Sequence, residues 1–289
     1  MSSTSHHQPR SKSLPCRPHP LILQCNQHLG SLEVSDEISS SSSLFSNKLT
    51  NLQTLYDCVE KLVLLPLTQE VVARERQEKW VEELLDGSLR LLDACSVAKD
   101  ALLHTKECAR ELQSIMRRKR GGEMEVTAEV RKFLASRKIV KKAISKALEN
   151  LKASLKKGKF SPSNKDHQTT SLVSLLKDVE VITLSILDSL LIFISGPAQS
   201  KPSWSLVSKL MKNKKVSGTQ EADQNEFAIV DAALQSFAFQ MTRKSGNINQ
   251  LQNQLENLES VIQDFVEALE TLFKRFIKIR VSLLNILNH

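Results

Sequence analysis

Residues 248–287 read INQLQNQLENLESVIQDFVEALETLFKRFIKIRVSLLNIL, and apolar side chains recur in this stretch at an unbroken spacing of three and four residues. This period places them on one face of a continuous helix. No glycine or proline follows Gly246, so a helix of about 60 Å is predicted at 1.5 Å per residue. The face consists of twelve residues, Ile248, Leu251, Leu255, Leu258, Ile262, Phe265, Leu269, Leu272, Phe276, Ile279, Leu283 and Ile286.

The flanks of this stripe indicate what the helix packs against. In a solvent-exposed zipper, complementary charges occupy the flanking positions. Here Val261, Val266 and Phe273 widen the apolar face in the second half of the helix instead. We therefore expect the helix to enter the interior of its own bundle. A coiled coil with a second copy of the chain, and hence a homo-oligomer, stands as the alternative.

Long proline-free tracts elsewhere in the chain indicate further helices, because proline is not tolerated in a helix interior. No alternating strand pattern accompanies them. The predicted fold class is all-α, an elongated helical bundle with long helices. The expected helices cover about residues 44–62, 67–120, 123–157, 172–194 and 227–243, with a short one at 204–212.

The first 43 residues differ in composition from the rest. They hold four prolines, a serine run at 39–43 and no acidic residue before Glu33. This composition predicts a disordered basic tail over residues 1–43. The remaining residues, 44–289, are expected to form one helical bundle domain, with linkers near 157–170, 196–203 and 213–224.

Cysteine usage and hydropathy bear on the compartment. Five scattered cysteines, an odd number without a CxxC pair, favour a reducing intracellular location, in the cytoplasm or at the membrane periphery. No early apolar run resembles a signal peptide. The most apolar window, residues 181–195, is shorter than the roughly 20 residues that span a bilayer and contains Asp188. It predicts a buried core helix, and membrane contact stands as the alternative.

The positive charge of the chain is concentrated in one segment. Residues 117–159 contain 15 Lys and Arg against four Glu, whereas the net charge of the whole chain is +8. Within this segment Lys138, Lys142, Lys152 and Lys156 lie away from the apolar stripe and form a basic amphipathic face. This face suits an anionic membrane surface or an acidic protein, or is simply solvated. Aromatic residues for base stacking are nearly absent, which argues against nucleic acid as a partner.

The basic tail contains a candidate phosphorylation site. Arg10, Ser11, Ser13 and Pro15 form the pattern Arg-Ser-x-Ser-x-Pro, which resembles the ligand motif of 14-3-3 proteins. Phosphate on Ser13 would add about −1.5 to −2 charge for an arginine cluster to bind. The surplus of Ser and Arg also resembles an organelle transit peptide, so a plastid location remains open.

Metal binding and catalysis find little support in the sequence. Asp86 and Asp93 each follow a pair of leucines and form no recognisable catalytic motif. No phosphate-binding glycine loop or GxSxG motif occurs. We predict no enzyme and no cofactor. Four Cys and His side chains of the tail match the number of ligands in a structural zinc site. Two prolines stiffen the segment between them, however, and we predict no metal there. The four residues are Cys16, His19, Cys25 and His28.

Several stretches together resemble the plant BYPASS-like family, a family first described as a plant domain of unknown function. They are residues 10–15 with His19-Pro20, residues 52–67 with Leu-Tyr-Asp-Cys and Leu-Pro-Leu-Thr-Gln, residues 84–93 (LLDGSLRLLD), and residues 272–287, which end in RVSLLNIL. The resemblance implies a plant protein connected with root and shoot development. It defines no active site and implies no functional residue.

These observations lead to one expectation and one alternative. We expect a non-enzymatic helical interaction protein whose phosphorylated tail docks onto partners such as 14-3-3 proteins. The alternative is a peripheral membrane protein that binds anionic lipid through its lysine-rich helix.

Overall fold

The computed structural model describes residues 19–34, 41–118, 123–157, 167–196, 225–240 and 248–288. Within these ranges the regular structure is entirely helical, which confirms the predicted all-α class. The helices are α1 (Pro20–Val34), α2 (Ser42–Val63), α3 (Pro66–Arg74), α4 (Lys79–Arg117), α5 (Glu123–Lys157), α6 (His167–Ser195), α8 (Glu226–Gln240) and α9 (Ile248–Asn288).

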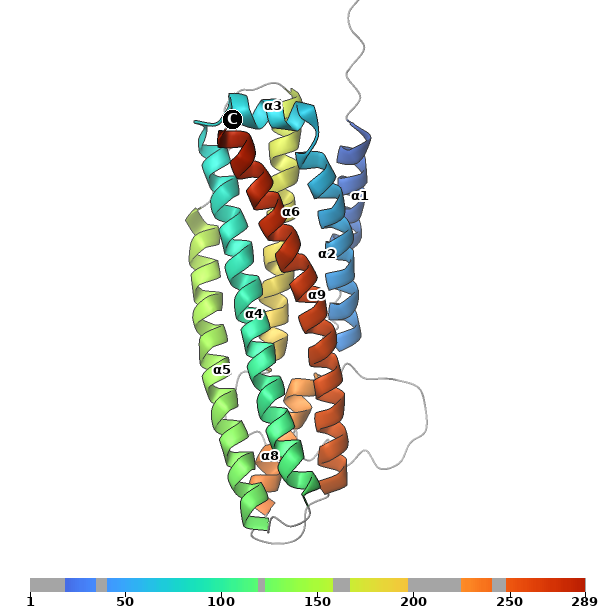
Figure 1. Cartoon of the computed structure of the whole chain (residues 1–289), viewed down its shortest axis with the longest axis vertical. Coiled ribbons are helices and arrows are strands. Elements are labelled where there is room, and N and C mark those ends of the chain that lie inside the picture. The colour runs from blue at the N-terminus through green and yellow to red at the C-terminus, as the bar shows by residue number, and fades with distance from the viewer. Residues whose placement is uncertain are drawn as a thin grey trace, which may run out of the picture.

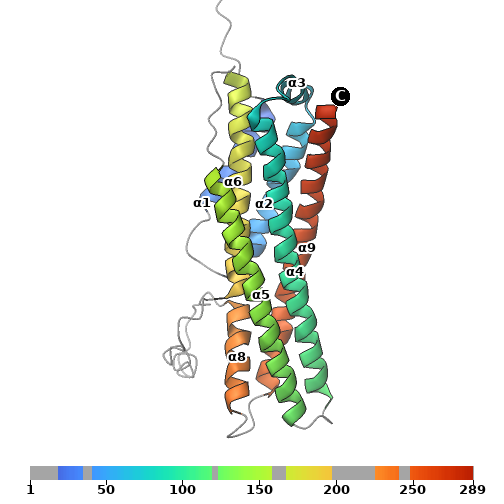
Figure 2. The same cartoon turned by 90° about the vertical axis from the view of Figure 1, so that its left-hand side faces the viewer.

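The long helices run side by side as an elongated bundle (Figure 1). Helix α9 packs most extensively against α4 and α2, and α6 completes the bundle against α4. Helix α5 packs along α4, α1 packs against α2 and α6, and α3 crosses one end. Helix α8 lies beyond the end of α6 in the same column, as both views show (Figures 1 and 2).

The apolar stripe of α9 lies inside this bundle, as its flanks predicted. Every stripe residue from Leu251 to Leu283 is buried, and Val266 on the flank is buried with them. The opposite face, with Ile277 and Val281, is exposed along the length of the helix. Helix α9 is therefore one wall of the bundle, with its seam covered by α4 and α2 of the same chain.

Aromatic side chains fill the middle of the core where four helices meet. The ring of Phe193 in α6 lies 4.8 Å from Phe45 in α2, 5.9 Å from Phe227 in α8 and 6.1 Å from Phe265 in α9. The last two pairs are edge-to-face, the arrangement that aromatic quadrupoles favour. Phe193 belongs to the apolar window at 181–195, so this window is a core segment, as predicted, and none of the described helices is long and apolar enough to span a membrane.

Two sequence predictions about helix boundaries were wrong. The tract expected as one helix over residues 67–120 forms α3 and α4, separated by a turn at 75–78. The indole nitrogen of Trp80 donates to the Glu75 carboxylate at 2.9 Å, which fixes this turn. Helix α3 can therefore cross the end of the bundle, while α4 follows its long axis.

The second correction concerns the range 1–43 that composition assigned to a disordered tail. Residues 20–34 of that range form α1, with Pro20 at the first helical position, where its missing N–H costs nothing. Ile22, Cys25, Leu29 and Leu32 are buried against the bundle. This spacing of three and four is the same helical signal as in α9, but it extends over only three turns.

Candidate functional site

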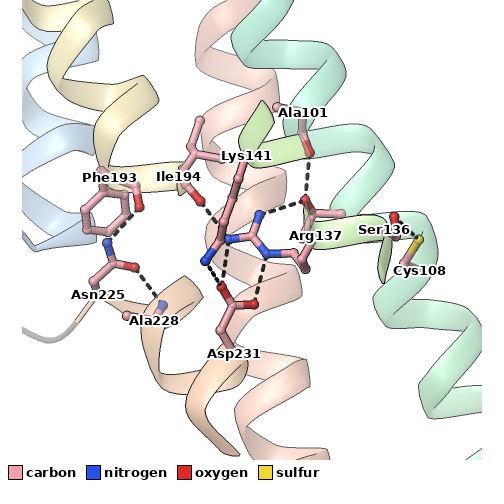
Figure 3. A network of polar contacts seen from close by, with 11 residues as sticks. Ala101, Cys108, Ser136, Arg137, Lys141, Phe193, Ile194, Asn225, Ala228 and Asp231 are labelled. Atoms are coloured by element: carbon pink, nitrogen blue, oxygen red, sulfur yellow. Dashed lines mark hydrogen bonds and ion pairs between the residues drawn. The ribbon is translucent and has the colours of Figure 1, made fainter. Parts of the chain in front are cut away.

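A buried polar network joins four helices at the junction of α6 and α8 (Figure 3). Arg137 of α5 and Asp231 of α8 are only 3% and 6% exposed. The Arg137 Nε and Nη2 donate to the two carboxylate oxygens of Asp231 at 3.0 and 3.2 Å, and Lys141 Nζ lies 2.9 Å from Asp231 Oδ2. Bidentate, charge-assisted bonds of this kind are among the strongest in proteins.

The remaining donors of Arg137 bind to α4 and α6. Its Nη2 donates to the carbonyl oxygen of Ile194 at 2.8 Å, and its Nη1 donates to the hydroxyl of Thr105 at 3.4 Å. The guanidinium also lies 5.4 Å from the centroid of the Phe227 ring. Because the last carbonyls of a helix have no intrahelical partner, a cation at the end of α6 satisfies one of them.

Asn225 serves both helices at this junction. Its side-chain NH2 donates to the carbonyl oxygen of Phe193 at 2.7 Å, near the end of α6. Its side-chain oxygen accepts from the backbone N–H of Ala228 at 3.0 Å, as an N-cap of α8 does. Gly196 ends α6 with φ of 71°, a left-handed conformation that favours glycine. The polar atoms of this network bind one another, so its role is to hold α5, α6 and α8 together.

The lysine-rich face lies on the other side of α5. Lys138, Lys142, Lys146 and Lys152 are exposed, and none of them forms an ion pair within the described part of the chain. At 3.6 residues per turn they lie within about a third of the circumference, over about 21 Å of helix. Lys156 lies in the same helix, but its side chain is outside the described residues. We call Lys138, Lys142, Lys146 and Lys152 the lysine face.

Other cations of the basic run are neutralised within the chain. Arg117 Nη2 lies 2.9 Å from the Glu256 carboxylate, and Lys132 Nζ lies 2.7 Å from that of Glu111. The Glu111 bond raises the pKa of Lys132 and lowers that of Glu111. The run therefore divides into cations that are paired or buried and cations without an ion pair in the described residues. The lysine face belongs to the second group, together with the exposed Arg118 and Arg131.

A cleft of about 490 Å³ opens at one end of α4, beside α9. Arg110, Arg117 and Arg118 line it, but Glu259 and Glu256 pair with the first two. The Nε2 of Gln113, also in its lining, is buried without a hydrogen-bond partner. Because the carboxylates offset two of the three positive charges, the cleft is a less favourable anion site than the lysine face.

Three stretches that carry the family resemblance meet in the other half of the bundle. Arg280 of α9 donates to the carbonyl oxygen of Leu85 at 2.5 Å and to the hydroxyl of Ser88 at 2.6 Å, so residues 272–287 bind residues 84–93. Tyr56, from the stretch at 52–67, packs edge-to-face with Phe276, with centroids 4.7 Å apart. Side chains from all three stretches line an apolar cavity of about 40 Å³.

Within residues 84–93, Gly87 leaves space for a side chain of the neighbouring helix α6. A Cβ at this position would lie 2.3 Å from the Glu180 carboxylate, which is closer than atoms can approach. Glu180 in turn accepts from Arg90 at 2.6 Å. The missing Cβ therefore leaves the space that the Glu180 carboxylate occupies while it pairs with Arg90. The shared stretches account for packing and not for a catalytic constellation.

The other sequence candidates are scattered. Asp86 and Asp93 are both exposed on α4. The Nδ1 of His19 accepts from the Leu21 N–H at 3.2 Å, while Cys25 is buried against Cys58. In the described residues no three His, Cys, Asp or Glu side chains are grouped to hold a metal. Arg10, Ser11, Ser13, Pro15 and Cys16 lie outside the described residues, as does the helix expected at 204–212.

Sequence reasoning missed Arg137 and Asp231, although a signal for them existed. The apolar stripe of α5 steps from Phe133 to Val140, and Arg137 fills the missing position at a spacing of four and three. Asp231 likewise lies on the buried face of α8 with Phe227 and Leu234. A charge that fills a gap in an apolar stripe is a candidate for a buried pair, because burial of an unpaired charge costs several kcal/mol.

Comparison with known families identifies the chain. The model of the family described as Protein BPS1 matches residues 48–286. The chain belongs to the BPS1 family. This assignment confirms the resemblance to the plant BYPASS-like family, and the matched region begins in α2 and ends in α9. Comparisons with curated proteins and with solved structures gave no match.

Proposed function

We propose that this BPS1-family chain is a non-enzymatic helical interaction protein, and that the lysine face of α5 is its docking surface for an acidic partner protein. A role in root and shoot development is consistent with the family. The observation that carries the proposal is the contrast along α5. Arg137 and Lys141 point inward and are paired with Asp231, whereas the lysine face points outward without an ion-pair partner in the described residues.

The rigidity of α5 favours such a surface. The buried pair Arg137–Asp231 and the packing of Val140 and Ile144 against the core hold the helix in one orientation. Lys138 and Lys142 follow directly on the two paired cations, so their direction is set by the same backbone. Preorganised charges attract an acidic partner without an ordering cost for the backbone, and the attraction falls with salt.

A charge-reversal experiment tests the proposal. Lys138→Glu with Lys142→Glu should weaken binding to an acidic probe, polyglutamate, by at least about thirtyfold. Loss of each lysine removes on the order of 1 kcal/mol near an anionic surface, and the new carboxylates add repulsion. Lys61→Glu with Lys274→Glu is the matched control, since both lysines are exposed and lie on α2 and α9. Equal loss in the two double variants, measured by fluorescence anisotropy, would assign binding to net charge and not to this face.

Anionic lipid is the second candidate, and a specific observation favours it. Ile139, between Lys138 and the rest of the lysine face, is 67% exposed. An apolar side chain flanked by lysines suits insertion beneath anionic headgroups. Flotation with phosphatidylserine vesicles separates the two candidates: Ile139→Ser weakens binding to vesicles and leaves polyglutamate binding unchanged if lipid is the partner.

The tail motif adds a proposal for regulation. Phosphorylation of Ser13 would give Arg10-Ser11-x-Ser13-x-Pro15 the form that 14-3-3 proteins bind. We expect Ser13→Ala to abolish recovery of 14-3-3 proteins from plant extract, while Ser5→Ala, a serine of the same tail outside the motif, serves as the control. Recovery that survives the Ser13 substitution would contradict this part of the proposal and leave the lysine face unaffected.

A further inference from the structure

Two cysteines of different helices lie in direct contact in the core. The Sγ of Cys25 in α1 is 2.9 Å from the Sγ of Cys58 in α2. Both side chains are buried, at 0% and 3% exposure. A disulfide joins sulfur atoms about 2.0 Å apart, so the two sulfur atoms need to approach by only about 0.9 Å to bond. The other described cysteines, Cys95 and Cys108, have no such neighbour. Their thiols donate hydrogen bonds to the carbonyl oxygen of Leu269 and to the hydroxyl of Ser136.

We propose that Cys25 and Cys58 are a site of covalent oxidation, at which a peroxide converts the two thiols into an intrachain disulfide that fastens α1 to the bundle. One thiol attacks the peroxide and becomes a sulfenic acid, with release of water. The other thiol then attacks the sulfur of the sulfenic acid and the S–S bond forms. The hydroxyl group leaves that sulfur, takes up the proton of the attacking thiol and is released as a second water. The two thiols together lose two electrons and two protons, and the peroxide is reduced.

Because Cys25 lies in α1, the position of this helix controls how readily the two thiols are oxidised. Burial raises the pKa of the Cys25 thiol, so the reactive thiolate is scarce while α1 stays in place. Ile22, Leu29 and Leu32 are the other buried side chains of α1 for which the structure describes burial, over residues 20–33. Because so few side chains anchor it, α1 opens locally at a lower cost than the long helices. Oxidation therefore proceeds through the state in which α1 has lifted, and the disulfide then prevents further opening.

The experiment uses the purified full-length chain treated with hydrogen peroxide. Digestion without reductant and mass spectrometry should find the peptides of Cys25 and Cys58 joined with loss of two hydrogen atoms, and dithiothreitol should separate them. Cys108→Ser is the control and should leave the link unchanged. Leu29→Ala, which removes a buried α1 anchor, should speed formation of the link roughly tenfold, since a buried leucine truncation weakens packing by at least that factor.

Three results would overturn the proposal. One is that peroxide treatment oxidises Cys108 fully and yet produces no disulfide between Cys25 and Cys58. Another is preferential joining of Cys25 or Cys58 to a cysteine other than its neighbour. The third is an equal yield of the link in native and urea-unfolded chains, which would show that the fold does not bring the two thiols together.

Discussion

Tyr56 is the one tyrosine of the chain, and it is buried where three helices meet. Its hydroxyl is 3.1 Å from that of Thr183 in α6, and its ring packs edge-to-face with Phe276 in α9. Burial raises the pKa of this phenol well above its ordinary value of 10. Burial also raises the pKa of the Cys95 thiol to about 12. Both groups are therefore neutral as long as the core is intact.

The alkaline titration of Tyr56 should report unfolding. Because the folded pKa exceeds the unfolded one, the neutral phenol contributes stability that is fully present below about pH 10 and lost as pH rises through the folded pKa. We expect the ultraviolet absorbance of tyrosinate to appear together with the loss of helical circular dichroism. In concentrated urea the same absorbance should appear near pH 10. Ionisation near pH 10 in a chain that is still helical would contradict the burial of Tyr56.

At the scale of elements, the Arg137–Asp231 pair decides whether α8 stays attached to α5. Asp231→Ala would leave Arg137 buried without its carboxylate, and we expect a loss of roughly 3–5 kcal/mol in the free energy of unfolding. The double variant Arg137→Met with Asp231→Leu should recover most of that loss, because a buried apolar pair of similar volume replaces the ion pair. Urea denaturation of the three proteins measures the differences.

The control for this prediction is Asp178→Ala, which removes an exposed carboxylate from α6. It should change stability by no more than about 0.5 kcal/mol. A loss of similar size in Asp231→Ala and Asp178→Ala would mean that the buried pair does not hold the junction. A double variant that is no more stable than Asp231→Ala would show that the geometry of the pair, and not its charge balance, is what α8 requires.

The long helices were predictable from sequence because strong periodicity extends over many turns. Helices α5 and α9 begin where Gly121-Gly122 and Gly246 predicted, and α6 ends at the predicted Gly196-Pro197 break. The turn at 75–78 was not predictable in this way, since it contains neither glycine nor proline. Helix α1 was missed because tail composition outweighed a short stripe. A local side-chain bond from Trp80 to Glu75 closes the turn, and a tertiary contact between Cys25 and Cys58 lies between α1 and α2.

The candidate site was predictable only in part, for a physical reason. Periodicity separates the outer face of α5 from its inner face, so Lys138, Lys142 and Lys152 were correctly placed on the surface. It does not show which cations find a carboxylate on a distant helix. The pairs Arg117–Glu256 and Lys132–Glu111 depend on how α4, α5 and α9 are arranged. A local count of charge therefore overstates the positive surface that a partner meets.

At the scale of the whole molecule, the bundle accounts for its own longest apolar stripe. Leu269 lies in the middle of α9 and is fully buried. Its carbonyl oxygen accepts from Cys95 of α4, and the neighbouring carbonyl of Ala268 accepts from Gln53 of α2. The seam that would join two copies in a zipper is thus covered from both sides by one chain. Unfolding should then depend on intrachain packing alone.

A concentration series tests this whole-molecule picture. Leu269→Ala should lower the free energy of unfolding by roughly 2–5 kcal/mol, as truncation of a fully buried leucine does. The denaturation midpoint of both the wild-type chain and the variant should be the same at every protein concentration, because no partner subunit contributes to the seam. Ile277→Ala, on the exposed side of α9, is the control and should cost much less. A midpoint that rises with protein concentration, and loses this dependence in Leu269→Ala, would assign the seam to a second copy of the chain.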